Sequence, residues 1–221
     1  VMVLSALSCL AVLMPPYIHN KTKAYKTELE RGVMKLGDMS KELERYITEN
    51  DFMKDLIATD RALEKSAGKS LTKEDRRNLA EIITREARSY DIDPILIVAL
   101  IYTESRFKTN ALSVKGAKGL MQLLPGTAEY VSLKIGEDIL KVANLYDVET
   151  NLKLGVAYLN YLIKKTGGNL EYALAAYNMG PANLYRALAR NKIPSSYSSK
   201  VLKKYEELSK AVKDTSLAYN G

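Results

Sequence analysis

One carboxylate in this sequence stands where it could act as an acid. An unbroken apolar run covers residues 95–102, and Glu104 follows it closely. Helical spacing places Glu104 on one stripe with Ile97, Leu100 and Ile101. A carboxylate with apolar neighbours at a helix C-terminus is poorly stabilised as an anion, so its pKa should rise. A carboxyl group that stays protonated near neutral pH can serve as a general acid.

Spacing alone does not establish that role for Glu104. Long charged side chains usually reach solvent or find a partner, and Arg106 and Lys108 are close enough in sequence to form an ion pair. A second polar group in unusual surroundings is Gln122, which lies inside an apolar stretch. It must be hydrogen-bonded internally or reach into a cleft. The small-residue loop 113–119 just before it would let backbone approach a ligand closely.

The element that would position Glu104 is a helix. Asp93 is a good N-cap, and Pro94 suits the first helical position. Because the helix is apolar on every face, it should be the most buried helix of the protein.

Further helices follow from caps and from apolar residues at helical spacing. No convincing strand, internal repeat or low-complexity stretch is present, so the predicted class is all-α. The predicted helices run from Thr72 to Tyr90, 149–165, 170–178, 183–190 and 201–212. In the helix 149–165 one face carries Leu152, Val156, Leu159 and Ile163, and Gly155 would allow a neighbouring helix to approach closely there.

The segment 1–18 reads as a targeting element. Residues 1–14 are apolar apart from Ser5 and Ser8, and two prolines end the stretch. Its length is short for a membrane span and suits the apolar part of a signal peptide. A cleaved export signal and an uncleaved membrane anchor both fit, while a buried core helix fits less well.

Residues 21–67 form a charged extension with helical periodicity. Leu29, Leu36 and Leu43 fall seven residues apart, but Ser40 and Asn50 interrupt the repeat, so the sequence does not specify a coiled coil. We expect an amphipathic helical pair packed on the main domain, because an amphipathic helix usually buries its apolar face. A stalk, or a docking helix for a partner in a secretion assembly, is the alternative.

Composition leaves several partner classes open. The chain has 221 residues, a net charge of +7 and one cysteine, so no intramolecular disulfide can form. The positive charge suits nucleic acid, anionic lipid or anionic wall polymers. We expect no nucleic-acid partner, because no nucleic-acid fold signature is present. His19, the only histidine, is far from the polar groups above, and no metal or cofactor site is expected.

Several ordered sequence blocks carry a family resemblance. They are Glu104-Ser105-Arg106-Phe107, Ser113-x-x-Gly-Ala-x-Gly-Leu-Met-Gln122, Pro125-Gly-Thr-Ala128, Ala176-Tyr177-Asn178-Met179-Gly180 and, more weakly, Tyr197-x-x-x-Val201-Leu202-x-x-Tyr205, with Ser198 in place of a valine. Together they closely resemble the catalytic domain of family 1 bacterial lytic transglycosylases, in the lysozyme-like superfamily. The resemblance covers about residues 79–208.

The resemblance implies a fold and a reaction. The fold would be a helical, lysozyme-like domain, of the goose-type lysozyme and lytic transglycosylase kind, over residues 70–212. The reaction would cleave the β-1,4 bond between N-acetylmuramic acid and N-acetylglucosamine in peptidoglycan without water, leaving a 1,6-anhydromuramyl end. Glu104 would act first as acid and then as base. No second carboxylate forms an obvious pair with Glu104, which suits substrate-assisted chemistry.

The same resemblance implies a set of substrate contacts. Tyr177 would donate its hydroxyl near Glu104 or to the substrate's acetamido group, and Tyr197 would line the cleft. Ser113 and Gln122 would hydrogen-bond sugar, and Met121 would pack. The expected substrate-binding residues are Ser113, Gln122, Tyr177, Asn178 and Tyr197.

Two other functions stay open at this stage. A muramidase would break the same bond with water, and a non-catalytic module would only bind the wall or serve in assembly. The expected location is the periplasmic side of the bacterial cell envelope. The expected partners are peptidoglycan strands, the inner membrane through residues 1–18, and an envelope or secretion assembly through residues 21–67.

Overall fold

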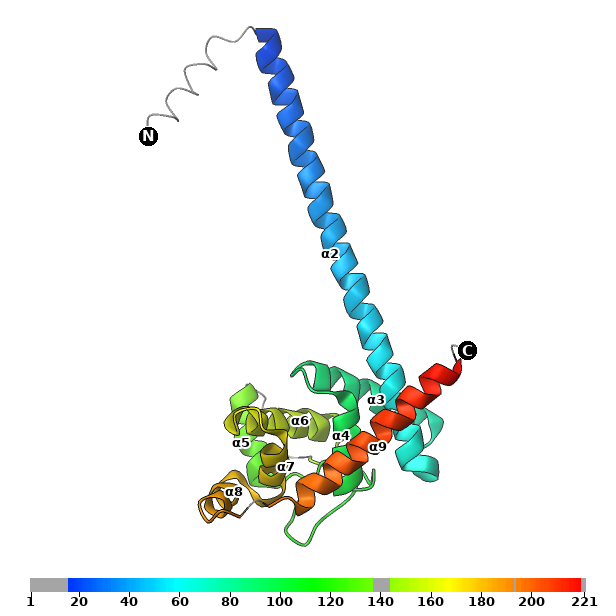
Figure 1. Ribbon diagram of the computed structural model, residues 1–221, viewed down its shortest axis with the longest axis vertical. Helices are drawn as coiled ribbons and strands as arrows, with labels where there is room; N and C mark the ends of the chain where they lie inside the picture. Colours follow the sequence, from blue (N-terminus) through cyan, green and yellow to red (C-terminus); the bar gives the residue numbers. More distant parts are fainter. Residues whose placement is uncertain (1–15, 137–143, 193, 220–221) are drawn as a thin grey trace. The chain divides into compact units, whose positions relative to one another are not determined.

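A computed structural model describes residues 16–136, 144–192 and 194–219 of the chain. Within these ranges the only extended pairings are two isolated bridges, from Lys118 to Leu112 and to Leu123, so the predicted all-α class is confirmed. The helices, labelled as in Figure 1, are α2 (Pro16–Ala67), η1 (Gly68–Ser70), α3 (Lys73–Arg88), α4 (Pro94–Glu104), α5 (Pro125–Ile135), α6 (Val148–Lys165), α7 (Leu170–Met179), α8 (Pro181–Leu188) and α9 (Ser196–Tyr219).

Helix α4 is the buried centre that the sequence predicted. Asp93 caps it by accepting a hydrogen bond from the Ile95 amide at 2.8 Å, and Pro94 takes the first turn. Every residue from 94 to 101 is buried. An all-apolar helix has no face that prefers water, so other helices must surround it.

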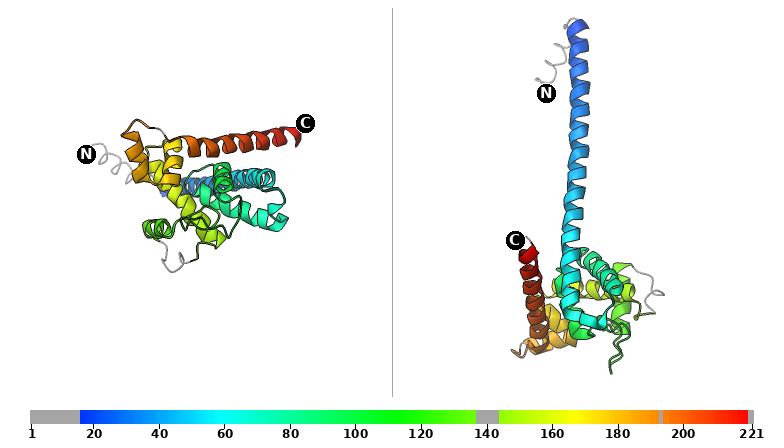
Figure 2. Two further views of the ribbon diagram at one scale, coloured as in Figure 1. Left: turned by 90° about the horizontal axis from the view of Figure 1, so that it is seen from below. Right: turned by 90° about the vertical axis from the view of Figure 1, so that its right-hand side faces the viewer.

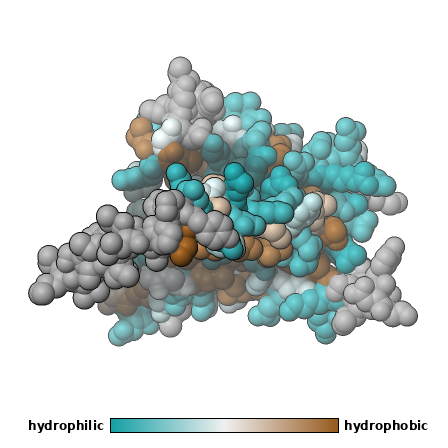
Figure 3. Space-filling model, turned by 90° about the horizontal axis from the view of Figure 1, so that it is seen from above, coloured by the Kyte–Doolittle hydropathy of each residue, from teal (hydrophilic) through white to brown (hydrophobic). Residues whose placement is uncertain are grey.

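Helices α3, α6 and α7 complete the core near α4. The predicted inward face of α6 is confirmed, because Leu152, Val156 and Leu159 have no exposed surface. Apolar burial of this kind supplies most of the free energy of folding. Hydrophilic residues cover most of the face drawn in Figure 3, and brown apolar residues lie between them.

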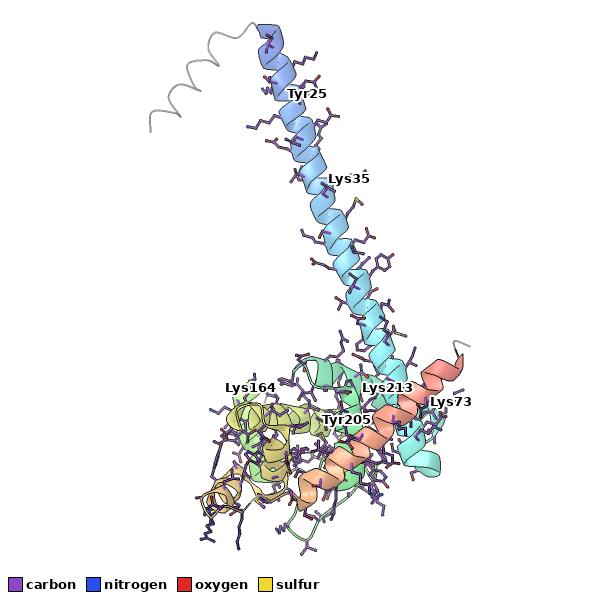
Figure 4. All side chains as sticks on the ribbon, in the orientation of Figure 1. Tyr25, Lys35, Lys73, Lys164, Tyr205 and Lys213 are labelled. Atoms are coloured by element: carbon purple, nitrogen blue, oxygen red, sulfur yellow. The ribbon has the colours of Figure 1, made fainter. Side chains whose placement is uncertain are left out.

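Helix α9 packs along α4, as the views in Figures 1 and 2 show. The Tyr205 hydroxyl, labelled in Figure 4, donates to Asp93 Oδ2 at 2.6 Å and so joins α9 to the N-cap of α4. At the C-terminal end of α4, two cations lie over the Tyr102 ring. The Arg106 guanidinium is 3.8 Å and Lys204 Nζ is 4.4 Å from the ring centroid. The contact of Lys204 with the Tyr102 ring adds a second attachment between α4 and α9.

Residues 16–67 form one helix where the sequence predicted a pair. Helix α2 is 52 residues long and continues through Gly32 and Gly37. The chain divides into two units, residues 1–51 and residues 52–221. In the first unit no described side chain from 20 to 50 is buried. The expected helical pair with a buried apolar face is therefore wrong. Figure 4 shows the side chains along this part of α2, with Tyr25 and Lys35 labelled.

The second unit begins before the predicted boundary at residue 70, because the last turns of α2 belong to its core. Leu63 has no exposed surface, and the Thr84 hydroxyl donates to Thr59 Oγ1 at 3.1 Å. Arg76 Nε lies 2.8 Å from Asp60 Oδ1, which ties α3 to α2. The segment 52–67 therefore folds with the domain that carries Glu104.

The predicted targeting segment 1–18 lies mostly outside the described residues. Among the helices that are described, none has the length and apolar character needed to cross a membrane.

Candidate active site

Glu104 is the last residue of α4, and its side chain is half-buried. Its carboxylate accepts a hydrogen bond from the Tyr197 hydroxyl. Burial raises the pKa of Glu104 from 4.5 to about 7, and the Tyr197 hydrogen bond acts in the opposite direction. Within the described part of the chain Glu104 forms no ion pair, and Arg106 lies over the Tyr102 ring instead. The raised pKa follows because the apolar helix withdraws the carboxylate from water.

Tyr197 is the direct partner of the acid, a closer role than the cleft wall that the sequence suggested. Helix α9 begins at Ser196, ahead of the predicted start at residue 201, so Tyr197 lies in its first turn. Burial, followed by the charge of Glu104, raises the pKa of the Tyr197 hydroxyl. Tyr197 therefore remains a hydrogen-bond donor at neutral pH.

Tyr177 lies near the acid but donates its hydroxyl elsewhere. The acceptor is the Met121 carbonyl oxygen at 2.9 Å. Burial, and to a smaller extent Glu104, raises the pKa of Tyr177 well above its ordinary value. Tyr177 thus holds the loop that precedes α5 against α7. The Met121 side chain is fully buried, as expected for a packing residue.

Gln122 and Ser113 bond within their own loop. Gln122 donates through Nε2 to the Gly119 carbonyl at 2.9 Å and to the Ala111 carbonyl at 3.2 Å. Ser113 Oγ accepts from the Ala117 amide at 3.0 Å. Of the two alternatives for Gln122, internal satisfaction is therefore what the structure contains. Direct contacts of both residues with sugar stay a prediction.

Asn151 was not singled out from the sequence, yet it organises the same loop. Its side chain is 1% exposed. Oδ1 accepts from the Met121 amide at 2.8 Å, while Nδ2 donates to the Lys118 carbonyl at 3.0 Å and to the Leu145 carbonyl at 2.9 Å. A buried amide needs such partners, so an asparagine beside Leu152 on the apolar face of α6 was the available signal.

Two glycines make room for this arrangement. At Gly119, φ is +76°, and an added Cβ would lie 2.4 Å from Asn151 Nδ2. At Gly155, an added Cβ would lie 2.3 Å from Met121 Sδ. We expected Gly155 to admit a neighbouring helix, and its close neighbour is the Met121 side chain instead. Any side chain at either glycine would displace the loop.

Asn178 is exposed at the end of α7 and lines a shallow pocket of about 290 Å³. Tyr197 lines the same pocket and also bonds to Glu104, so one tyrosine connects the pocket with the acid. The described residues include no group of three or more acidic, histidine or cysteine side chains that could hold a metal ion. The other lining residues are Ala175, Met179, Pro194, Ser196 and Lys200.

The protein is all-helical over its described residues, with a half-buried acid at the end of an apolar helix. Its fold matches the 70 kDa soluble lytic transglycosylase of Escherichia coli with a TM-score of 0.52 at 23% identity, over 72% of this chain and 29% of that one. The family described as transglycosylase SLT domain matches residues 81–200, and the chain belongs to that family.

Curated relatives agree in sequence over the same region. A soluble lytic murein transglycosylase of Salmonella typhimurium is 37% identical over 105 residues, which is 47% of this chain and 16% of the relative. A membrane-bound lytic murein transglycosylase E of Buchnera aphidicola is 31% identical over 124 residues, which is 52% of this chain and 56% of the relative. The chain thus matches only part of each relative's length.

Proposed function

We propose that this protein is a peptidoglycan lytic transglycosylase. It cleaves the β-1,4 bond between N-acetylmuramic acid and N-acetylglucosamine without consuming water. The observation that carries the proposal is Glu104, whose pKa burial raises to about 7 while Tyr197 holds its carboxyl group. Membership of the transglycosylase SLT family supports the same reaction.

In the first step Glu104 acts as the general acid. Its carboxyl proton passes to the glycosidic oxygen as the bond from that oxygen to the muramyl C1 breaks. The substrate's acetamido group stabilises the positive charge that develops at C1. This assignment agrees with the surroundings of Glu104, because no second carboxylate among the described residues contributes to the shift of its pKa.

In the second step Glu104 acts as the base. The new carboxylate takes the proton of the muramyl C6 hydroxyl, and the C6 oxygen forms a bond to C1. The products are a 1,6-anhydromuramyl end and a free N-acetylglucosamine end, and Glu104 is protonated again. The Tyr197 hydroxyl stabilises the carboxylate between the two steps, since a hydrogen bond to the charged form favours it.

The substrate contacts divide into two kinds. Asn178 and Tyr197 line the pocket, and in this proposal they contact the sugar directly. Ser113, Gln122 and Tyr177 shape the loop beside the acid, and Ser113 and Gln122 keep oxygen atoms that can accept hydrogen bonds from sugar hydroxyls. Removing a loop residue should therefore affect substrate binding and loop stability together.

The site of action is the bacterial cell envelope, where the substrate lies. One relative is named a soluble enzyme and another a membrane-bound one, so relatives of both kinds are known. Export or anchoring through residues 1–18 on the periplasmic side, and an assembly partner for residues 21–67, stay predictions. The family resemblance supports the first, and the exposed side chains of α2 support the second.

Product analysis tests the reaction. Purified cell-wall sacculi are digested with the full chain, and the released fragments are analysed by mass spectrometry. We expect anhydromuramyl ends, and reducing muramyl ends would instead identify a hydrolytic muramidase. Glu104→Gln should abolish release while circular dichroism shows an unchanged fold. The matched control is Glu129→Gln, since Glu129 is exposed on α5. Equal release by wild type and Glu104→Gln would contradict catalysis.

A further inference from the structure

Helix α2 displays an apolar stripe that nothing in the described residues covers. Leu29, Leu36 and Leu43 are 69%, 67% and 61% exposed. Large apolar side chains gathered on one exposed helix face mark an interaction surface. Between 20 and 50 every described side chain is exposed, so this surface is available to a partner.

The stripe has the spacing of a coiled-coil seam. From Tyr25 to Asn50 the seam residues alternate between steps of four and three, which gives a period of 3.5 residues. A straight α-helix has 3.6 residues per turn and drifts about 20° per heptad from such a seam, so a supercoiled helical partner follows the seam best. In heptad letters, a is held by Leu29, Leu36, Leu43 and Asn50, and d by Tyr25, Gly32, Met39 and Tyr46.

We propose that residues 25–50 of α2 pair with the same residues of a second copy, as a parallel, in-register, two-stranded coiled coil. Asn50 selects this arrangement. A single asparagine at an a position specifies register, because each amide meets its own counterpart across the seam. The residue that interrupts the leucine repeat thereby becomes its alignment point. In an antiparallel pair, Asn50 would face the other end of the partner's seam.

Charges beside the seam agree with the parallel register. Residues at g lie opposite e residues of the partner five positions further on. Like charges meet only at the start, where Lys21 faces Lys26. An antiparallel pair would instead bring Glu28 close to Glu49 and Lys35 close to Glu42 of the other copy, so the charges are compatible with the parallel register and Asn50 selects it. In the parallel pair, the g residues from 28 to 42 all face uncharged e residues. These pairs are Glu28 with Val33, Lys35 with Ser40, and Glu42 with Ile47.

A pair of matched substitutions tests the seam. Leu36 and Met34 are 67% and 64% exposed, and they occupy an a and an outward f position. Light scattering after size exclusion should give twice the chain mass for the wild type. Leu36→Glu should give the single-chain mass, while Met34→Glu should stay at twice that mass. Both variants keep the apolar residues 1–14 and add the same charge, so neither feature can explain a difference between them.

Disulfide trapping tests the orientation. In a Cys9→Ser background that keeps Asn50, Leu43→Cys should form a covalent dimer under mild oxidation, because facing a positions bring the two sulfur atoms within bonding reach. Met34→Cys should not. A monomeric wild type, equal behaviour of Leu36→Glu and Met34→Glu, or failure of Leu43→Cys to cross-link would overturn the proposal. A monomer that binds only a different envelope protein would assign the stripe to that partner.

Discussion

Helices α4 and α2 follow opposite patterns, and the difference shows what an apolar pattern specifies. Helix α4 is apolar on every face, and its residues 94–101 are all buried. The first part of α2 has one apolar stripe, and none of its described residues from 20 to 50 is buried. An all-apolar helix determines its own environment, since no face can be left in water. An apolar stripe requires a partner surface, but the stripe by itself does not identify that partner.

Each of the two helices has a polar residue at odds with its pattern. Glu104 follows the apolar run of α4 closely, and Asn50 interrupts the leucine repeat of α2. Burial raises the pKa of Glu104 and so prepares it for proton transfer. Asn50, by our proposal, aligns two copies. In both helices, by our proposals, the residue that departs from the apolar pattern is the one that carries the function.

The largest expected difference between the helices is in stability. Leu100→Ala removes a fully buried side chain from α4 and should lower the free energy of unfolding by about 3 kcal/mol. Leu36→Ala removes an exposed leucine from α2 and should change it by less than about 0.5 kcal/mol. Urea unfolding of dilute protein, followed by circular dichroism, measures both. Similar losses would contradict the contrast between the helices.

A smaller effect should appear when stability is measured against pH. The pKa of Glu104 rises from 4.5 to about 7 on folding, so its favourable contribution is complete below about pH 4.5 and is lost as the pH rises through 7. A shift of this size corresponds to about 3 kcal/mol, reduced to about 2 kcal/mol by partial exposure. Glu104→Gln, which cannot ionise, should therefore be the more stable protein above pH 7.

The control for this pH effect comes from α2. Glu42 has a side chain that is 60% exposed, so Glu42→Gln should change stability little. Urea midpoints collected across the acid and alkaline range compare the three proteins. If Glu104→Gln gave no advantage at alkaline pH, burial of the acid would not be the cause of its raised pKa.

The smallest expected effect concerns the pH dependence of lysis. Glu104 works as an acid only while protonated, so activity should fall as the pH rises through about 7. The Tyr197 hydrogen bond lowers the pKa of Glu104, and Tyr197→Phe should therefore move this fall upward by about one pH unit. Sacculus lysis at a series of pH values measures the midpoint.

Tyr205→Phe is the matched control for Tyr197→Phe. Both tyrosines lie on α9 and donate to a carboxylate of α4 or its cap, but Tyr205 bonds to Asp93 at the far end. Its removal should leave the midpoint in place. A shift of the same size in both variants would indicate a general loosening of α9.

Local patterns predicted most of the helical domain. The Asp93 cap and the apolar run sufficed for α4, and the inward face of α6 was read correctly from its spacing. Helix α5 was missed, because its polar positions form no clear stripe. The predicted helical pair was wrong, because α2 continues through Gly32 and Gly37. A glycine lowers helix propensity, but helix formation is cooperative, so the helix-forming residues on either side carry the helix through it.

The site was harder to predict than the fold because its contacts are distant in sequence. Glu104 could be chosen only when the family resemblance was added to its apolar neighbours, because spacing alone did not establish its role. Its bond with Tyr197 crosses 93 positions, and the hydroxyl of Tyr177 crosses 56 positions to the Met121 carbonyl. No local pattern encodes which tyrosine reaches which acceptor. The geometry follows only when α7 and α9 are placed against α4.

The position of Tyr197 has a consequence for the order in which the site is assembled. Glu104 is synthesised long before α9, the last described helix, which brings the hydroxyl that steadies its carboxylate. A nascent chain still lacking α9, or one clipped ahead of Ser196, carries the acid without that donor. Assembly of the acid with its hydrogen-bond partner therefore waits for the segment that begins at Ser196.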